Sequence, residues 1–430
     1  MIALIKTLQV ILALSFLIFI HELGHFTWAK AFHIKVEKFY LFFDIGGKHL
    51  ARWHWGETEF GIGWLPLGGY CKIAGMVDES MDMEQLKQEP QPWEFRTHPA
   101  WQRLLVMFGG VLNNFIFAIL AFILIMGIWG DAVIPAKGTK IYVNELAAEM
   151  GFRNGDEILD LDGRVPEDFL VIQSDIARRG VRKVNVLRGS DTVTIYIDRA
   201  MVEDIINSPL MFDIAVPFVV DSVVSEANAC LQKGDRIIGL GGARTEYLQD
   251  ARIALAEQKG SCTWASVIRG TDTLSMELQV DTAGMIGVIL PRTSVEYREY
   301  TALEAIPAGL ELSWETVAGY VKDLKLLVTP STGAYKSVGS FVAIGQIMPS
   351  VWDWHQFLYI LALLSVMLGV MNLIPIPGLD GGHILFTLYE MVTGRKPSEK
   401  FLYIAQLLGM VLLVMLMMLA FGNDIGRLIH

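Results

Sequence analysis

Four long apolar stretches constrain the fold of this 430-residue chain more than any other feature. They lie near residues 8–29, 104–129, 357–374 and 401–421. Each is close to the ~20 residues that a helix needs to cross the hydrocarbon core of a bilayer. An apolar fraction of 53% and a mean hydropathy of +0.41 are too high for a soluble protein. The sequence therefore predicts a polytopic α-helical membrane protein with four transmembrane helices.

The first apolar stretch leads into a metal-binding pattern, His21-Glu22-Leu23-Gly24-His25. Residues four apart share one face of a helix, so His21 and His25 can each present a ring nitrogen to one zinc ion. Glu22 lies one step round the helix, where its carboxylate can act as general base toward the attacking water. A signal-peptide core is the alternative, but no small-residue cleavage site follows. We therefore predict one Zn²⁺ per chain, with Glu22 as the catalytic residue.

The third apolar stretch runs into a second polar motif that begins at Asn372. Pro375 and Pro377 break the helix within or at the edge of the membrane. Asp380 follows the break and is a functional candidate because ionisable residues are costly there. Asp380 would be the third zinc ligand, ranked above His383, and the fourth position would stay open as a catalytic site requires. A helix N-cap is its alternative role, and the two roles are compatible. Asn372 could donate a hydrogen bond to a substrate strand or a developing oxyanion.

Residues 40–76 alternate in character and are rich in glycine and aromatic side chains, a pattern that predicts β-hairpins. The hairpin tips are apolar, so we expect a membrane-associated β-hairpin region that dips into the bilayer near the zinc. An ordinary amphipathic hairpin is the alternative. Residues 77–100 are polar and predict an exposed loop. The candidates for contact with substrate are Gly61, Gly63, Gly68, Gly69 and, in the second apolar stretch, Asn114. For Asn114 a helix–helix hydrogen bond is the alternative.

Residues 131–300 differ from the rest of the chain, with short β-rich runs, frequent glycine and an excess of acidic residues. The stretch 147–159 recurs at 226–238, and both copies resemble the core of PDZ domains. Such domains bind extended peptides by adding a strand to a sheet edge. Steric bulk over the active site is an equal alternative, and Cys230 stands where the pattern has glycine. A Cys230–Cys262 disulfide stays open. The expected groove residues are Met150, Gly151, Phe152, Cys230 and Leu231.

These features divide the chain into ten expected segments. Transmembrane helices occupy 1–34, 101–130, 356–383 and 401–422, and a β-hairpin or re-entrant region with its loop occupies 35–100. Two PDZ-like β-rich domains are inserted at 131–215 and 216–295. An amphipathic helix on the membrane surface and a connector follow at 296–355, with packing on the soluble domains as the alternative. A cytoplasmic loop occupies 384–400 and a tail 423–430.

Basic residues gather in the segments 35–100 and 384–400. The positive-inside rule therefore predicts that these two loops are cytoplasmic. Four spans then place both termini and the PDZ-like pair on the opposite, periplasmic side. The net charge of −11 gives no support for nucleic acid as a partner.

The two polar motifs together resemble the site-2 protease family of intramembrane zinc metalloproteases. The H-E-x-x-H and N-x-x-P-x-P-x-x-D-G patterns match completely, at His21, Glu22, His25, Asn372, Pro375, Pro377, Asp380 and Gly381. One departure lies in the second apolar stretch, where Gly110–Phe115 resembles the family's G-P-x-x-N-F. Val111 replaces the proline there, and Asn114 is the matching asparagine.

The resemblance implies a protease in the bacterial inner membrane with its active site open toward the cytoplasm. Its implied substrate is a single-pass membrane protein of the anti-sigma-factor type, cut within its transmembrane segment. An upstream site-1 protease acts first, in envelope-stress signalling of the sigma-E type. Remnant signal peptides are a second implied substrate class, and the PDZ pair would act as a size filter. A membrane-anchored PDZ scaffold with an inactive protease core, or a zinc enzyme with a non-peptide membrane substrate, are the alternatives.

Overall fold

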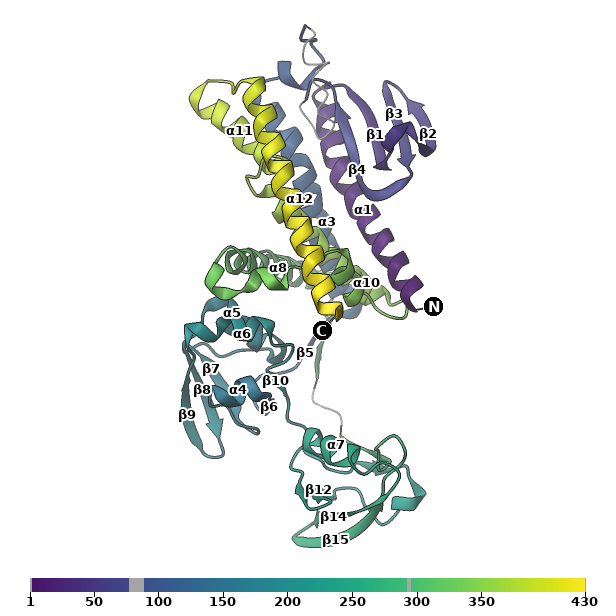
Figure 1. Ribbon diagram of the computed structural model, residues 1–430, viewed down its shortest axis with the longest axis vertical. Coiled ribbons are helices and arrows are strands. Elements are labelled where there is room, and N and C mark those ends of the chain that lie inside the picture. Colours follow the sequence, from purple (N-terminus) through teal and green to yellow (C-terminus); the bar gives the residue numbers. More distant parts are fainter. Residues whose placement is uncertain (1, 77–88, 292–294, 430) are drawn as a thin grey trace. The chain divides into compact units, whose positions relative to one another are not determined.

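The computed structural model describes residues 2–76, 89–291 and 295–429. It consists of two compact units, each described separately below (Figure 1). The first unit contains residues up to Gly130, residues 299–328 and the chain from Tyr335 onward. The second contains residues 131–298 and 329–334. The first half of the predicted loop at 77–100, residues 77–88, lies outside the described residues, but Glu94 and Phe95 in its last part are buried rather than exposed.

Four helices of the first unit are long and apolar enough to cross a membrane, among the residues that the structure describes. They are α1 (Ile2–Ala31), α3 (Ala100–Trp129), α10 (Trp354–Leu373) and α12 (Glu399–Ile429). The prediction of four membrane-spanning helices is thus confirmed in the length and apolar composition of the helices. The segment 384–400, predicted as a loop, is helical as far as Thr393, because α11 (Asp380–Thr393) begins directly after the proline break.

Helix α3 is the central helix of this unit and packs against α1, α10, α11 and α8 (Ala305–Leu327). The crossing with α1 is a contact between backbones, since a β-carbon on Gly24 would run into the Gly109 carbonyl. Helix α8 is the predicted amphipathic helix; its Gly309 faces Ile123 of α3 and leaves no room for a side chain. The short helix α9 (Phe341–Ile347) lies in the predicted connector.

The glycine- and aromatic-rich segment forms one four-stranded sheet rather than a series of hairpins. Its strands are β1 (Val36–Phe43), β2 (His49–Trp55), β3 (Thr58–Gly63) and β4 (Leu65–Ile73), in the order β2-β3-β1-β4. Only β2 and β3 make a hairpin; β1 pairs with β3 in parallel and with β4 antiparallel. The alternation in the sequence showed which residues share a face but not which strands are partners. The sheet flanks α1, with β4 and β1 against the helix (Figure 1).

The second unit holds two β-rich subdomains, each with its own hydrophobic core. The first contains β6 (Ile141–Val143), α4 (Glu145–Glu149), β7 (Glu157–Leu161), α5 (Ile172–Arg179), β8 (Lys183–Arg188), β9 (Asp191–Tyr196), α6 (Val202–Asn207) and β10 (Phe212–Ile214). The second contains β11 (Ser222–Val223), β12 (Arg236–Leu240), β13 (Ala243–Arg244), α7 (Leu248–Ala256), β14 (Cys262–Arg269), β15 (Asp272–Gln279) and β16 (Val288–Ile289). Strands β5 (Asp131–Val133) and β17 (Glu296–Arg298) pair where the chain enters and leaves.

The two subdomains share one buried ion pair at equivalent places in the repeated sequence. Arg188 binds Asp156 through Nε and Nη2 at 2.8 and 2.7 Å, and Arg269 binds Asp235 in the same way at 2.7 and 2.6 Å. Both aspartates are 1% exposed or less. The hydrogen bonds from Arg269 lower the pKa of the Asp235 carboxyl.

The expected groove residues of the second unit divide into buried side chains and exposed backbone. Phe152 and Leu231 lie in the two cores with about 1–3% exposure, and Met150 is also buried. Their side chains therefore contribute to the two cores, and the prediction that these segments line a peptide groove stays a prediction. Gly151 and Cys230 are exposed, and the carbonyl of each accepts a hydrogen bond from the nearby arginine. All three cysteines are free thiols, so a Cys230–Cys262 disulfide is not formed in this structure.

Candidate metal centre

Three side chains from two distant parts of the sequence meet at one point in the first unit. His21 and His25 project from α1, and Asp380 from the start of α11. The His21 and His25 Nε2 atoms are 3.2 Å apart, and Asp380 Oδ2 lies 3.1 and 3.4 Å from them. Both histidines are buried, with 6–7% exposure. Among the described residues, these three side chains form the group of potential metal ligands whose atoms lie within 4.8 Å of one another.

The spacing of these three atoms fits a bound metal ion. Ligands about 2.05 Å from a tetrahedral zinc are about 3.3 Å from one another, which is the separation observed. Asp380 Oδ2 is buried and receives no hydrogen bond from a described residue. His25 Nδ1 lies 2.9 Å from the Val106 carbonyl, so Nδ1 carries the proton and Nε2 presents a lone pair. A cation bound by His21 Nε2, His25 Nε2 and Asp380 Oδ2 would remove the repulsion among the three lone pairs that face one another there.

Asn114 of α3 is part of this centre rather than of a substrate surface. It is fully buried, and its side-chain amide lies 2.9 Å from His21 Nδ1. Its Oδ1 is buried without a partner. The nitrogen and oxygen of a side-chain amide are told apart only by their hydrogen bonds, so the Asn114 amide can be turned by 180°. In that orientation Oδ1 accepts the proton on His21 Nδ1, and His21 Nε2 is free to bind a metal. Asn114 thus makes the helix–helix hydrogen bond that was the alternative to substrate contact, and this bond orients His21.

Two glycines of α3 explain how the ring nitrogens come so close to that helix. A β-carbon on Gly110 would overlap His25 Nε2 and lie 2.8 Å from His21 Cε1. A β-carbon on Gly109 would meet the Trp28 ring and the backbone of Gly24. The absence of side chains at these positions therefore lets α3 approach α1 closely and leaves room for both imidazole rings. The sequence analysis missed this role, although the glycine pair in the middle of an apolar helix was a visible signal.

Asp380 is held by a tightly folded connection between α10 and α11. Helix α10 ends at Leu373, before Pro375, and Asp380 is the first residue of α11. The N-cap position belongs to Leu379, whose side chain makes no capping bond, so the N-cap role considered for Asp380 is wrong. His383 does not belong to the group of three potential metal ligands, and the sequence analysis had also preferred Asp380 to it.

Glu22 and Asn372 approach the centre from two further directions. The backbone of Cys71 in β4 makes a hydrogen bond to the Glu22 carboxylate, so the sheet fixes the predicted general base. The Asn372 amide, near the end of α10, lies 3.3 Å from His21 Nε2. Both polar groups therefore lie beside the group of three potential ligands. Cys71 had not been singled out in the sequence, since a backbone donor leaves no sequence signal.

The four glycines predicted to contact substrate divide between an inner and an outer strand. Gly61 and Gly63 lie in β3, which is paired on both sides, so its backbone cannot accept another strand; this part of the prediction is wrong. Gly68 and Gly69 lie in β4, whose second edge has no strand partner among the described residues. Strand β4 is also the strand that holds Glu22. The structure thus leaves β4 as the edge that could pair with an extended substrate.

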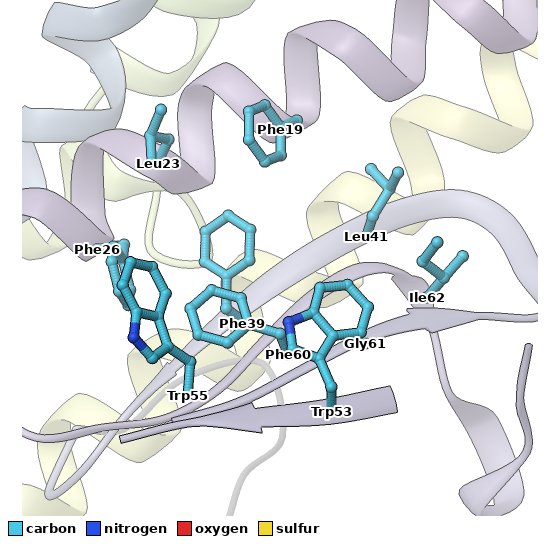
Figure 2. A pocket seen from close by; sticks show the side chains of 10 residues that line it. All are labelled: Phe19, Leu23, Phe26, Phe39, Leu41, Trp53, Trp55, Phe60, Gly61 and Ile62. Atoms are coloured by element: carbon cyan, nitrogen blue, oxygen red, sulfur yellow. The ribbon is translucent and has the colours of Figure 1, made fainter. Parts of the chain in front are cut away.

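A cavity of about 340 Å³ lies between α1 and the other three strands. Figure 2 shows side chains from α1 and from β1, β2 and β3 converging on it. Phe19, Leu23 and Phe26 line it from successive turns of α1, on a different face from His21 and His25. Its remaining walls are apolar, including Trp53 and Trp55. None of the side chains that line the cavity is acidic, basic or nucleophilic, and the three potential metal ligands are not among them.

Comparison with known proteins places the whole chain in one family. Residues 9–416 match peptidase family M50. The chain belongs to this family. The M50 peptidases are the site-2 proteases, so the resemblance drawn from the two motifs is confirmed, and the chain is a metalloprotease.

Full-length M50 relatives are found in several bacteria. The protease RseP of Yersinia pestis is 31% identical to this chain, over 97% of the chain and 98% of the relative. The regulator of sigma-E protease RseP of Escherichia coli is 30% identical over the same shares. A putative zinc metalloprotease of Campylobacter jejuni is 28% identical over 99% of the chain and 94% of the relative. The similarity therefore includes the inserted β-rich unit as well as the membrane helices.

Proposed function

We propose that this M50 protein is a zinc-dependent intramembrane protease of the bacterial inner membrane that acts in sigma-E-type envelope-stress signalling. The observation that carries the proposal is the meeting of His21 Nε2, His25 Nε2 and Asp380 Oδ2 at tetrahedral spacing. One zinc ion per chain would be held by these three atoms. When bound, zinc supplies the Lewis acidity that lowers the pKa of water toward neutrality.

The residues around the centre have distinct roles in the proposed hydrolysis. Glu22, positioned by the Cys71 backbone, takes the proton of the attacking water and then delivers it to the leaving amine. Asn372 donates its amide hydrogen to the carbonyl oxygen as negative charge develops there. The Nδ1 bonds to Val106 and Asn114 keep both imidazoles in one orientation.

The substrate is proposed to be a single-pass membrane protein of the anti-sigma-factor type, with remnant signal peptides as a second class. A helix hides its carbonyls in i→i−4 hydrogen bonds, so the substrate must unwind before the water can reach one. The outer edge of β4 offers the unwound segment backbone partners beside Glu22. Gly68 and Gly69 keep part of that strand free of side chains. The name of the Escherichia relative, a regulator of sigma-E protease, supports the pathway.

The inserted unit is proposed to be a tandem pair of PDZ-like domains that excludes substrates with bulky extracytoplasmic parts, so that a site-1 protease must cut first. The shared Asp–Arg pair at equivalent positions supports a duplication. With Phe152 and Leu231 buried in the cores, size exclusion is favoured over peptide capture through those side chains. We therefore propose a filter rather than a second peptide site.

The proposed orientation places both basic loops on the cytoplasmic side and the termini and the PDZ-like pair in the periplasm. Arg103 at the start of α3 forms a 2.5 Å ion pair with Glu390 of α11, and Lys396 Nζ donates to the Arg96 carbonyl. The two basic loops thus meet at one end of the first unit, as a common side of the membrane requires. Their positive charge favours the cytoplasm for that end.

The decisive test compares the purified protein with Glu22→Gln on a tagged single-pass substrate whose extracytoplasmic part has been removed. We expect the parent to cut within the membrane segment. Glu22→Gln should lose cleavage by roughly 10²–10⁴-fold, the usual share of a general base, and still hold zinc. If both proteins hold zinc and neither cleaves, the scaffold alternative replaces the protease.

A further inference from the structure

Helix α12 touches the ligand-bearing loop through a contact between backbones. Most of its side chains from Leu407 to Met418 are exposed, as expected of a helix that faces lipid. Gln406 and Gly409, three residues apart on one face, are buried. Leu413 follows one turn later on the same face. This face of α12 therefore packs on protein, and Gly409 lies at its centre.

The neighbour of Gly409 is the loop that precedes Asp380. The Pro377 carbonyl oxygen occupies the place where a β-carbon on Gly409 would be, and Pro377 Cα lies 3.1 Å from that place. From the other side, Gly378 has a φ of +104°, and a β-carbon on it would lie 3.4 Å from Gly409, Met410 and Leu413, an ordinary contact distance. Gly378 is therefore favoured by its backbone conformation, whereas Gly409 cannot take a side chain unless the two segments move apart.

The same loop is confined on its opposite side by α11. A β-carbon on Gly381 would lie 2.6 Å from the Ile374 carbonyl carbon, and one on Gly382 would lie 2.7 Å from the Ile376 carbonyl oxygen. In the sequence, Asp380 lies between Pro377, which contacts Gly409, and the glycine pair Gly381–Gly382, which contacts the residues after α10. A displacement of Pro377 therefore cannot be absorbed within the loop and must move the Asp380 carboxylate.

The position of α12 along its own axis is also fixed. Asp424 Oδ2 accepts hydrogen bonds from the backbone N–H and the hydroxyl of Ser340, at 2.8 and 2.5 Å. Asn423 donates to the carbonyls of Tyr335 and Val338. The height of Gly409 relative to the loop is thus set by polar bonds near the far end of the helix.

We propose that Gly409 is a positioning residue for the third metal ligand, so that α12 determines where the Asp380 carboxylate lies. The proposal rests on the metal centre of the proposed function and adds to it a helix that contributes no ligand. Gly409 acts through Pro377 and touches neither the metal nor the substrate. Its effect must therefore appear in metal affinity as well as in cleavage.

The test is Gly409→Ala in the full-length protein, with Gly422→Ala on the same helix as the matched control. A β-carbon on Gly422 meets nothing within 4 Å, so both variants change helix propensity equally but only one displaces the loop. Zinc affinity is measured by competition with a chelator, and the absorption spectrum of the Co²⁺-loaded protein reports the ligand geometry. We expect Gly409→Ala to lose ~10–100-fold in zinc affinity, the usual effect of disturbing a ligand's support, and to change the Co²⁺ spectrum.

Gly422→Ala is expected to match the parent in both measurements. If Gly409→Ala binds zinc within about twofold of the parent, below the usual effect of a lost support, the proposal is overturned. If Gly409→Ala does not accumulate, Leu413→Ala decides: a several-fold loss of zinc affinity supports the proposal and unchanged affinity overturns it. Failure of the parent to bind zinc would instead contradict the proposed function.

Discussion

The two halves of the metal centre are built in opposite ways. His21 and His25 come from one unbroken helix, and each ring is oriented by a group on α3, the Val106 carbonyl or Asn114. Asp380 follows a proline-broken connection between two helices and is confined by α10, α11 and α12. The two histidines, here called the helix half, are positioned by α1 and α3. Asp380, the loop half, is positioned by α10, α11 and α12. Local helix geometry therefore fixes one half, whereas tertiary packing fixes the other.

The largest expected effect comes from filling the space beside the helix half. Gly110→Ala would place a methyl group against both imidazoles, 2.8 Å from His21 Cε1. Because a displacement of about 1 Å can cost roughly 10²-fold in rate, cleavage should fall by at least that much. Gly127→Ala on the same helix meets only Ala305 at 3.5 Å and should cleave like the parent. Equal rates for the two variants would show that the helix half tolerates displacement.

A smaller effect is expected from removing the support of His21. Asn114→Ala should weaken zinc binding by ~10–100-fold, as loss of a partner to a ligating histidine usually does. Asn114→Asp keeps an acceptor for the Nδ1 proton and should bind zinc more tightly than Asn114→Ala. Calorimetric titration of zinc into both apo proteins checks this order. The reverse order would mean that the amide donates to Nδ1, against the assignment made above.

Removing the metal should loosen the loop half more than the helix half. With zinc chelated, we expect hydrogen exchange of residues 374–382 to rise about tenfold, which corresponds to ~1.4 kcal/mol of local stability. Residues 21–25 should keep their protection because their amides bond within α1. Mass spectrometry of the protein with and without chelator measures both segments. A uniform change in the two segments would remove the distinction between them.

The smallest effect is expected at Ser365, whose hydroxyl donates to the backbone carbonyl of Asn114 at 2.9 Å. Ser365→Ala removes one buried hydrogen bond and should lower the free energy of unfolding by about 1 kcal/mol. The side chain of Asn114 keeps its place, so zinc affinity should change little. Thermal unfolding in detergent and the same zinc titration test this. A loss of zinc affinity as large as that of Asn114→Ala would show that the support extends to α10.

The helix half could be predicted from sequence because an i, i+4 pair on an apolar helix carries its geometry with it. Asp380 was found because a charge after a proline break is rare in such surroundings. For Asn114 the sequence could not decide between substrate contact and a helix–helix hydrogen bond, since the choice depends on how α3 is rotated against α1. Gly409 carried no signal for the same reason: glycine is common in membrane helices, and only its neighbour shows why it is needed.

The sheet shows the same limit for strand pairing. Alternation in residues 40–76 indicated strands, which the structure contains, and side chains of three of these strands line the cavity against α1. The parallel pairing of β1 with β3 has no local signal, because the two strands are joined through β2 rather than by a turn. Gly61 was therefore named as a candidate for contact with substrate, although it lies in an inner strand.

The close crossing of α1 and α3 at Gly24 has a consequence for the order of biosynthesis. Both helices are made before the β-rich unit, so this pair and its two histidines can assemble while the ribosome is still translating. Asp380 and the helix that confines it are made last. The nascent chain therefore lacks a complete ligand set until almost all of it is in the membrane.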